Sequence, residues 1–317
     1  MKKLLTFILL AISIGLVYYG YTLYQDLPLD YKNLSITLKP ELPEAFNTSS
    51  TLIQFSQGMR FSKNKLSYFF ENDCNLERKN AMKEAFNMIS EGTGIIYFYE
   101  LENTNEEPDI IISCSEETKQ REDSSEELKT FIAGEGGPRK YLDLNPYPLI
   151  IQGEIQLYSN RYATHCEELL VELHELLHVF GFNHIDKKES ILYPYLSCNQ
   201  KLDEEIIDAL IELYSVPSKP ELSIRNISAS KAGKYLDFNI EIYNSGLINA
   251  TNIILEVISE EKSIKEFDVK TISPGVITTL NIKNLDLKSS KINSIIFRIK
   301  ASEEEYFLEN NLVEMSI

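Results

Sequence analysis

The spacing of hydrophobic residues changes twice along the 317-residue chain. Residues 4–24 form one uncharged run, residues 59–216 mix short apolar runs with segments of helical period, and residues 217–317 alternate with period two. Period two predicts half-buried strands, whereas a spacing of three and four predicts a helix with one buried face. The pattern therefore predicts an apolar N-terminal segment, an α+β domain and an all-β domain.

Residues 59–216 contain both strand and helix patterns. Strands rich in Ile, Tyr and Phe are predicted at residues 65–70, 94–101, 109–114 and 153–158, with an edge strand or bulge in the glycine-rich residues 131–137. Helices are predicted at residues 76–90, 166–181 and 202–214. We expect a mixed sheet followed by two helices that are joined by a loop.

A proline-containing linker, SVPSKP at residues 215–220, precedes the third stretch. Beyond it, period-two runs are separated by Gly, Asn, Ser and Pro. Such spacing is typical of a β-sandwich of roughly seven strands in about 100 residues. We therefore place an all-β sandwich at residues 217–317.

The uncharged run follows Lys2 and Lys3. As a helix, it would rise about 31 Å, which matches the hydrocarbon core of a bilayer. The two lysines favour a cytoplasmic N-terminus, and the tyrosines that end the run suit the outer interface. Residues 1–24 are thus predicted to be a single transmembrane anchor with the ectodomain outside; the alternative is a cleaved signal peptide and a secreted protein. The proline-containing residues 25–58 are interpreted as a stalk or pro-segment.

The net charge of the chain bears on whether it binds nucleic acids. The formal net charge is −17, and no basic stripe is present in the sequence. An acidic chain repels phosphate backbones, so we expect no nucleic-acid partner.

The segment HELLHVFGFNH holds three of the four histidines. His174 and His178 are four residues apart, so one helix face presents both imidazoles to one cation. Gly181 can end the helix with a positive φ and let His184 supply a third ligand. Three imidazoles leave the fourth zinc position open for water, which Glu175 could deprotonate.

The alternative is an amphipathic core helix that carries histidines by chance. Apolar residues do surround the motif, and burying three unpaired imidazoles among them would be costly. A single catalytic zinc ion removes that cost. A calcium site is possible in such an acidic chain, but no spaced ligand pattern predicts one.

These residues carry the whole HExxHxxGxxH signature of the metzincin clan of metalloproteases, and the chain resembles the matrixins within that clan. The segment SILYPYLSCNQKLDEEIIDALIELY (residues 190–214) is similar to the matrixin Met-turn and the helix after it. The resemblance implies an α+β zinc endopeptidase at residues 59–216, with a mixed sheet, a site helix, a Met-turn-like loop and a C-terminal helix. Its substrate would be a peptide or protein.

Two departures from the matrixin pattern stand out. Leu192 occupies the position of the turn methionine, a swap of similar volume that apolar cores tolerate. The upstream cysteine that silences matrixin zymogens is missing, since the first cysteine, Cys74, already lies inside the domain. The resemblance places Tyr193 and Tyr195 near a specificity pocket, with structural packing as the alternative.

Four cysteines allow three pairings, and an exported domain would let them oxidise. The resemblance implies the pairs Cys74–Cys114 and Cys166–Cys198, the second of which would brace the site helix against the turn. Reduced, packed cysteines are the alternative.

The C-terminal stretch resembles adhesion-type (CARDB-like) immunoglobulin-like modules of prokaryotic surface proteins. The segments that carry this likeness are PEL at 220–222, YNSG at 243–246, SPG at 273–275 and ENN at 309–311. Such a module would bind a surface partner.

Together these features predict a membrane-anchored zinc endopeptidase that acts on extracytoplasmic proteins. The alternative function is a surface adhesion or binding protein with a structural or degenerate zinc site. Retention of Glu175 favours the enzyme, because a structural site needs no base.

Overall fold

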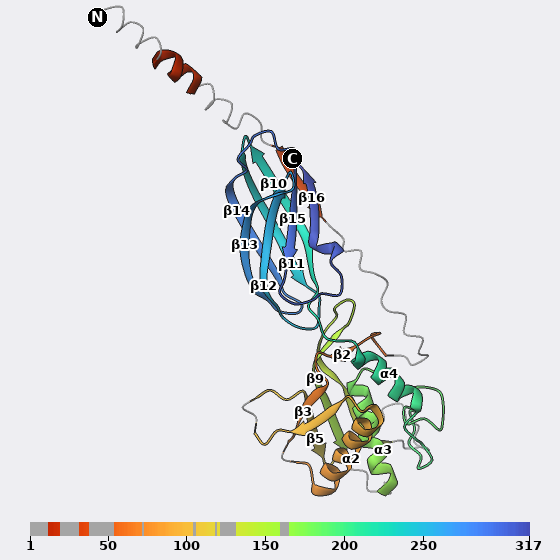
Figure 1. Ribbon diagram of the computed structural model, residues 1–317. Helices are drawn as coiled ribbons and strands as arrows, with labels where there is room; N and C mark the ends of the chain where they lie inside the picture. The colour runs from red at the N-terminus through yellow and green to blue at the C-terminus, as the bar shows by residue number, and fades with distance from the viewer. Residues whose placement is uncertain are drawn as a thin grey trace, which may run out of the picture. The chain divides into compact units, whose positions relative to one another are not determined.

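The computed structural model describes residues 12–19, 32–37, 54–71, 73–103, 106–117, 119–120, 131–158 and 165–317 (Figure 1). The chain forms two compact units. The α+β unit comprises Leu42–Lys219 and Gly246–Ile248, and the β-sandwich unit comprises Met1–Glu41, Pro220–Ser245 and Asn249–Ile317. Along the sequence, the α+β unit is therefore inserted into the β-sandwich unit.

The α+β unit is built on a mixed sheet. Its parallel strands, in spatial order, are β2 (Arg60–Phe61), β9 (Leu149–Tyr158), β5 (Ile110–Ser115), β3 (Lys65–Phe70) and β4 (Tyr97–Glu100). Strand β8 (Gly134–Leu142) runs antiparallel to β9, and β6 (Lys119–Gln120) pairs with β7 (Phe131–Ile132). This sheet confirms the predicted α+β class.

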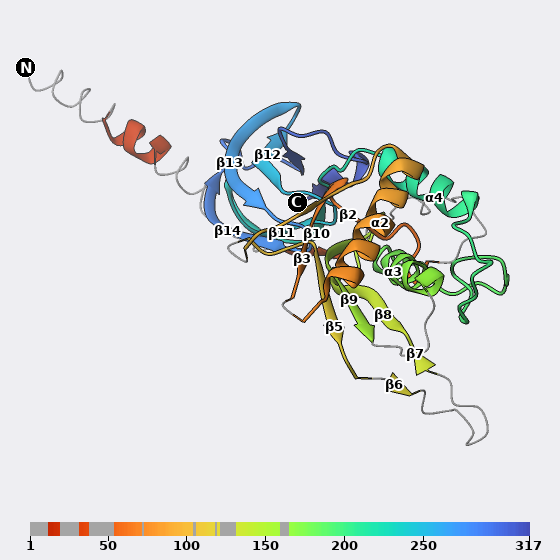
Figure 2. The same cartoon turned by 90° about the horizontal axis from the view of Figure 1, so that it is seen from below.

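Three helices pack on this unit: α2 (Leu76–Thr93), α3 (His165–Val179) and α4 (Glu204–Ser215). Helices α2 and α3 lie side by side on one face of the sheet (Figure 2). The Asn75 side chain caps α2 by accepting from the Arg78 N–H at 2.9 Å, and Gly94 ends it with a φ of 64°. Phe86 stacks between Tyr68 and Phe98, at ring-centroid distances of 4.4 and 4.5 Å. The buried aromatic layer thus holds α2 against β3 and β4.

A buried arginine joins the two ends of this unit. Arg60 of β2 donates to the carbonyl groups of Leu213 and Val216, at 2.5 and 2.7 Å. These carbonyls belong to the end of α4, where helical partners run out. The guanidinium therefore caps α4 and fixes it beside β2.

The β-sandwich unit consists of two four-stranded antiparallel sheets. One sheet has the order β1 (Lys32–Thr37), β10 (Leu222–Ala232), β11 (Tyr235–Asn244) and β14 (Ile277–Asp286); the other has β13 (Lys262–Ile272), β12 (Ala250–Ser259), β15 (Ser294–Lys300) and β16 (Leu312–Ser316). The Phe238 and Phe297 rings meet between the sheets at 5.1 Å. The all-β architecture is as predicted, while the likeness to immunoglobulin-like modules stays a prediction.

Strand β1 comes from residues that the sequence suggests are a stalk. It pairs with β10 in antiparallel register, from Lys32 opposite Lys231 to Thr37 opposite Asn226. Gln54, which also lies in the predicted stalk, instead forms an isolated β-bridge with Phe182 of the α+β unit.

Of the predicted N-terminal anchor, only residues 12–19 are described, and they are helical. No helix in the described residues is long and apolar enough to span a membrane.

A buried carboxyl group links the two ends of the β-sandwich sequence. Glu305 accepts hydrogen bonds from the Leu222 N–H at 2.7 Å and from the Asn311 amide at 2.8 Å. Burial raises the pKa of Glu305 to about 7, and the charges of Glu221 and Glu303 add to this increase. Glu305 is therefore protonated in the folded protein at pH values where the unfolded chain is ionised.

Deleting β1 tests its contribution. A protein that begins at residue 42 would leave residues 226–231 of β10 as an open edge. Every second one of these residues points its N–H toward β1, and we expect those amides to exchange with deuterium about tenfold faster than in a protein that begins at residue 25. Amides of residues 60–215 serve as the internal control. Equal protection of β10 in both proteins would contradict the pairing.

Glu305 also predicts a pH dependence of stability. Because its folded pKa is raised from about 4.5 to about 7, its contribution to stability is present below pH 4.5 and is lost as pH rises through 7. The largest slope for this one proton is about 1.4 kcal/mol per pH unit. Urea unfolding between pH 4 and 8 should show this slope in the parent protein and a shallower one in Glu305→Gln. Identical slopes would refute the assignment.

Candidate metal centre

Helix α3 and the turn after it position three histidines. His174 and His178 lie one turn apart on α3, which ends at Val179. Gly181 then has a φ of 84°, and its N–H donates to the His178 carbonyl at 2.9 Å. This left-handed residue confirms the predicted exit from the helix, and the loop beyond it carries His184.

The three imidazoles converge through their Nε2 atoms. The distance from His174 Nε2 is 3.0 Å to His178 Nε2 and 3.1 Å to His184 Nε2, and the last pair is 3.3 Å apart. Zn–N bonds of about 2.0–2.1 Å in tetrahedral geometry would place such nitrogens about 3.3 Å apart. The three side chains that the sequence predicts as ligands are therefore close enough to share one metal ion.

Backbone carbonyl groups fix the orientation of two of these rings. His174 Nδ1 lies 2.6 Å from the Ile191 carbonyl, and His178 Nδ1 lies 2.6 Å from the Phe182 carbonyl. A carbonyl only accepts, so each Nδ1 carries a proton, and in the neutral ring Nε2 then presents its lone pair. Lone pairs that face one another about 3 Å apart repel unless a cation lies between them. The donor set thus fits a metal ion.

Burial keeps the imidazoles neutral, as metal ligation requires. The pKa of His174 is lowered to about 3, chiefly by burial and in part by the neighbouring His178 and His184. The pKa of His178 is also lowered, again chiefly by burial. Neutral imidazole is the form that binds zinc.

Glu175 lies in a close contact between α3 and strand β8. A Cβ atom on Gly136 would lie 2.2 Å from the Glu175 carbonyl oxygen, and one on Gly134 would lie 2.9 Å from its Oε1. The pKa of Glu175 is raised to about 8, chiefly by burial and in part by the charges of Glu135 and Glu172. The Gly136 N–H, which donates to the carboxylate, opposes this change. A divalent cation at the three histidines would favour the carboxylate form.

The predicted turn lies directly behind the ligands. Leu192 is fully buried, and its carbonyl accepts from the Ile185 N–H at 3.0 Å. The Ser190 hydroxyl donates to Asp203, which also pairs with Lys187 at 2.7 Å. Since Asp203 stands at the start of α4, this helix holds the turn that fixes His174.

The two tyrosines of the turn lie beside each other, with ring centroids 5.9 Å apart. Tyr195 is exposed and Tyr193 is half-buried. Gln200 is buried beneath them and donates to the Tyr195 carbonyl at 2.7 Å. A role for these tyrosines in specificity stays a prediction.

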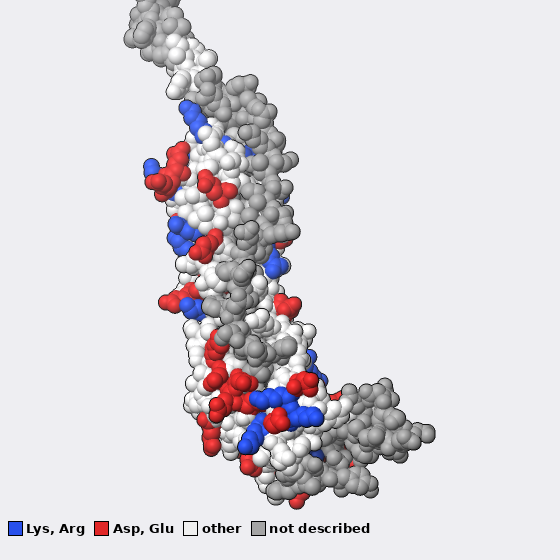
Figure 3. Space-filling view, turned by 90° about the vertical axis from the view of Figure 1, so that its right-hand side faces the viewer, with Lys and Arg blue, Asp and Glu red and all other residues white. Residues whose placement is uncertain are grey.

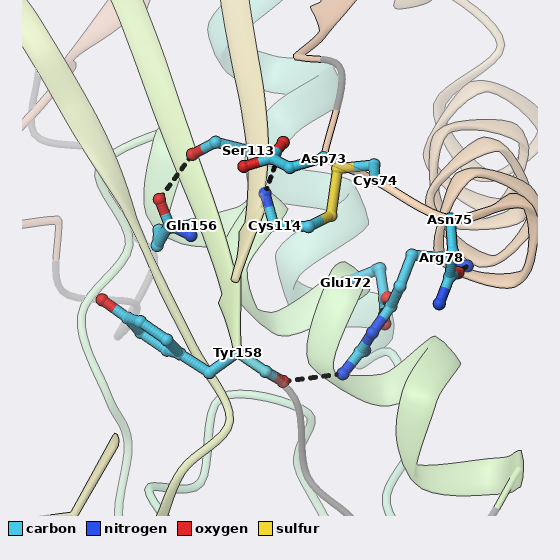
Figure 4. Close-up of a disulfide and its surroundings, with 9 residues drawn as sticks. All are labelled: Asp73, Cys74, Asn75, Arg78, Ser113, Cys114, Gln156, Tyr158 and Glu172. Carbon is cyan, nitrogen blue, oxygen red and sulfur yellow. Dashed lines mark hydrogen bonds and ion pairs between the residues drawn. A yellow bond between two sulfur atoms is a disulfide. The ribbon is translucent and has the colours of Figure 1, made fainter. Parts of the chain in front are cut away.

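Cys74 and Cys114 form a disulfide that joins the residue before the α2 cap to β5 (Figure 4). This is the first of the two expected pairs. Cys198 is disulfide-bonded as well. The side chain of Cys166 lies outside the described residues, so its pairing with Cys198 stays a prediction.

Near this disulfide, a buried ion pair joins α2 to α3. Arg78 Nη1 lies 2.8 Å from Glu172 Oε1, and Arg78 Nη2 donates to the Tyr158 carbonyl at 2.9 Å (Figure 4). Glu172 is fully buried and lies one helical turn before Glu175. The contact thus fixes the helix segment that carries the histidines and Glu175.

Several residues of this site are absent from the sequence-based expectations. Gln54 donates to the Phe180 carbonyl at 2.8 Å, and the Phe55 N–H donates to the Gly181 carbonyl at 3.0 Å. Both support the turn between the histidines. The i, i+2 spacing of Gly134 and Gly136 is a signal that could have been used, since it places two glycines on one face of a strand.

Comparison with known proteins agrees with this geometry. The three histidines form a site that could hold one metal ion. The family model described as Matrixin matches residues 60–215, so this part of the chain is similar to the matrixins. No curated protein matches the chain.

The close contact at Gly136 predicts that alanine substitutions at positions 136 and 137 have very different effects on stability and zinc binding. In Gly136→Ala, the new methyl group would displace the α3 backbone, whereas Gly137 has no neighbouring atom within 4 Å of an added Cβ. We expect Gly136→Ala to lose about 1–3 kcal/mol of stability and to bind zinc more weakly. Gly137→Ala is the matched control and should do neither. Equal unfolding curves and zinc affinities for the two variants would disprove the close-contact account.

Proposed function

We propose that the protein is a zinc-dependent endopeptidase that hydrolyses peptide bonds of extracytoplasmic proteins, with Glu175 as the general base. The observation that carries this proposal is the convergence of three Nε2 lone pairs from His174, His178 and His184. Glu175 follows the first of these ligands directly and is held in the contact with β8. A structural zinc site would normally use a fourth protein ligand, whereas the three found among the described residues leave a position for water.

Zinc, when bound, would lower the pKa of water and polarise the substrate carbonyl. The residues of the chain supply the rest of the chemistry. His174 and His178 hold their Nδ1 protons on backbone carbonyls, so their Nε2 atoms would be available to hold the ion. Glu175 takes a proton from the attacking water and delivers it to the nitrogen of the leaving amine.

The peptide substrate is proposed to lie extended along β8. Within the described residues, this strand pairs with β9 alone and forms an edge of the mixed sheet. The Gly136 N–H on this edge donates to Glu175, and an added strand could pair with the other backbone groups that point to the edge. Because Gly134 and Gly136 contact Glu175, a peptide on this edge would pass beside the base.

The proposed location is the outer face of a membrane, with residues 1–24 as the anchor. The Cys74–Cys114 disulfide supports an oxidising compartment. The uncharged run behind Lys2 and Lys3 supports anchoring or export. Figure 3 shows one face on which basic side chains are scattered among acidic ones, which suits a protein substrate better than a phosphate backbone.

The competing function is a surface-binding protein whose zinc site is structural. The β-sandwich could bind a surface partner in either case. The two functions differ in whether Glu175 matters for turnover.

The test compares the full-length protein with Glu175→Gln and with Glu154→Gln, an exposed glutamate on β9 that serves as the control. Zinc content and cleavage of a mixed peptide library would be measured together. We expect one zinc per chain in all three proteins, with cleavage about a hundred- to ten-thousandfold slower in Glu175→Gln only. Removal of zinc by a chelator should abolish cleavage.

Bound zinc without cleavage by any of the proteins would support the binding protein instead. Absence of zinc from the parent protein would contradict the proposal.

A further inference from the structure

The backbone N–H and C=O groups of successive β8 residues point alternately toward β9 and toward the open edge of the sheet. The Ala133 carbonyl accepts from the Tyr158 N–H at 2.9 Å, so the groups of residue 133 point toward β9. In an antiparallel ladder, successive residues point to opposite sides. The N–H and C=O groups of Gly134 and Gly136 therefore point to the open edge, while those of Glu135 point to β9. The hydrogen bond from Gly136 N–H to the Glu175 carboxylate agrees with this direction.

The Glu135 side chain lies on the sheet face away from α3. Successive side chains of a strand alternate between its faces, and the Cβ positions of Gly134 and Gly136 face α3. On the opposite face, Lys119 Nζ lies 2.8 and 2.7 Å from the two carboxylate oxygens of Glu135. The Tyr158 hydroxyl donates to Glu135 at 2.6 Å. About half of the Glu135 side chain remains exposed.

We propose that Glu135 is a specificity-determining residue that selects a basic side chain at the substrate position opposite it on the added strand. This inference rests on the proposed peptidase function and concerns the same site. It identifies the preferred substrate class as extended peptides with Lys or Arg at that one position.

The position opposite Glu135 brings side chains closest together. Because the backbone groups of Glu135 point to β9, its partner on an antiparallel added strand would form a non-hydrogen-bonded pair. The Cα atoms of such pairs are about 4.5 Å apart, nearer than in hydrogen-bonded pairs. The carboxylate is thus the first charge that the opposing side chain meets.

The existing ion pair leaves room for a second cation. Lys119 also bonds to the Tyr158 hydroxyl of β9 at 3.3 Å, so it lies on the β9 side of Glu135. The added strand would lie on the other side. Elsewhere in this protein, Glu256 binds both Arg298 and Lys300 at 2.7 Å, so one carboxylate can hold two cations. An acidic substrate residue would face the carboxylate without a cation between them.

The test uses the full-length protein and three variants: Glu135→Gln, Glu135→Lys and the control Glu154→Gln. Glu154 is an equally exposed glutamate paired with Arg139, but it lies on β9 and away from the open edge. Each protein would digest a peptide library in which every position flanking the scissile bond varies. Ratios of Lys to Glu peptides within one digest cancel any change in overall rate.

The parent protein should prefer Lys or Arg at one position by about two- to fivefold, the range for an exposed charge pair. Glu135→Gln should lose this preference, Glu135→Lys should reverse it, and Glu154→Gln should keep it. Active proteins with identical preferences at every position would overturn this inference and leave the peptidase function intact. No cleavage by any of the four proteins would instead refute the peptidase function on which it rests.

Discussion

Two backbone carbonyl groups determine what the three histidines can do. The Ile191 and Phe182 carbonyls accept from the Nδ1 atoms of His174 and His178, and both imidazoles therefore point Nε2 at the same place. Neither carbonyl lies on the helix that carries the ligands. The loop after Gly181 supplies one, and the turn that contains Leu192 supplies the other. The geometry of the centre thus depends on how these two segments are held.

The turn that contains Leu192 and the loop after Gly181 are each held by contacts with other parts of the domain. Asp203 ties the turn to the start of α4, and Arg60 ties the end of α4 to β2. Gln54 and Phe55 support the loop after α3. On the other side of α3, the glycines of β8 permit close approach, and the Arg78–Glu172 ion pair connects it to α2. The site helix is therefore constrained on several sides, which is what preorganisation of a metal centre requires.

The ligand set could be predicted from the sequence because its determinants are local. A spacing of four places His174 and His178 on one helix face, and Gly181 permits the turn to His184. The Nδ1 acceptors and the glycine contact depend on tertiary packing between distant segments, which no local pattern encodes. The same contrast between local patterns and distant contacts explains why two edge strands are hard to predict from the sequence. Strand β13 is rich in charged residues, as edges of sheets commonly are, and these weaken the apolar pattern from which a strand is predicted. Strand β1 lies far from the rest of its sheet in the sequence, among residues whose prolines suggest a stalk.

The most direct test of the central claim is X-ray absorption spectroscopy at the zinc edge of the zinc-loaded protein. The account predicts three imidazole nitrogens and one further light atom from solvent at about 2.0–2.1 Å, with no sulfur. The same first shell should remain in Glu175→Gln, because Glu175 is not a ligand. A shell that contains sulfur, or one that changes when Glu175 is replaced, would contradict a catalytic centre with an open fourth position.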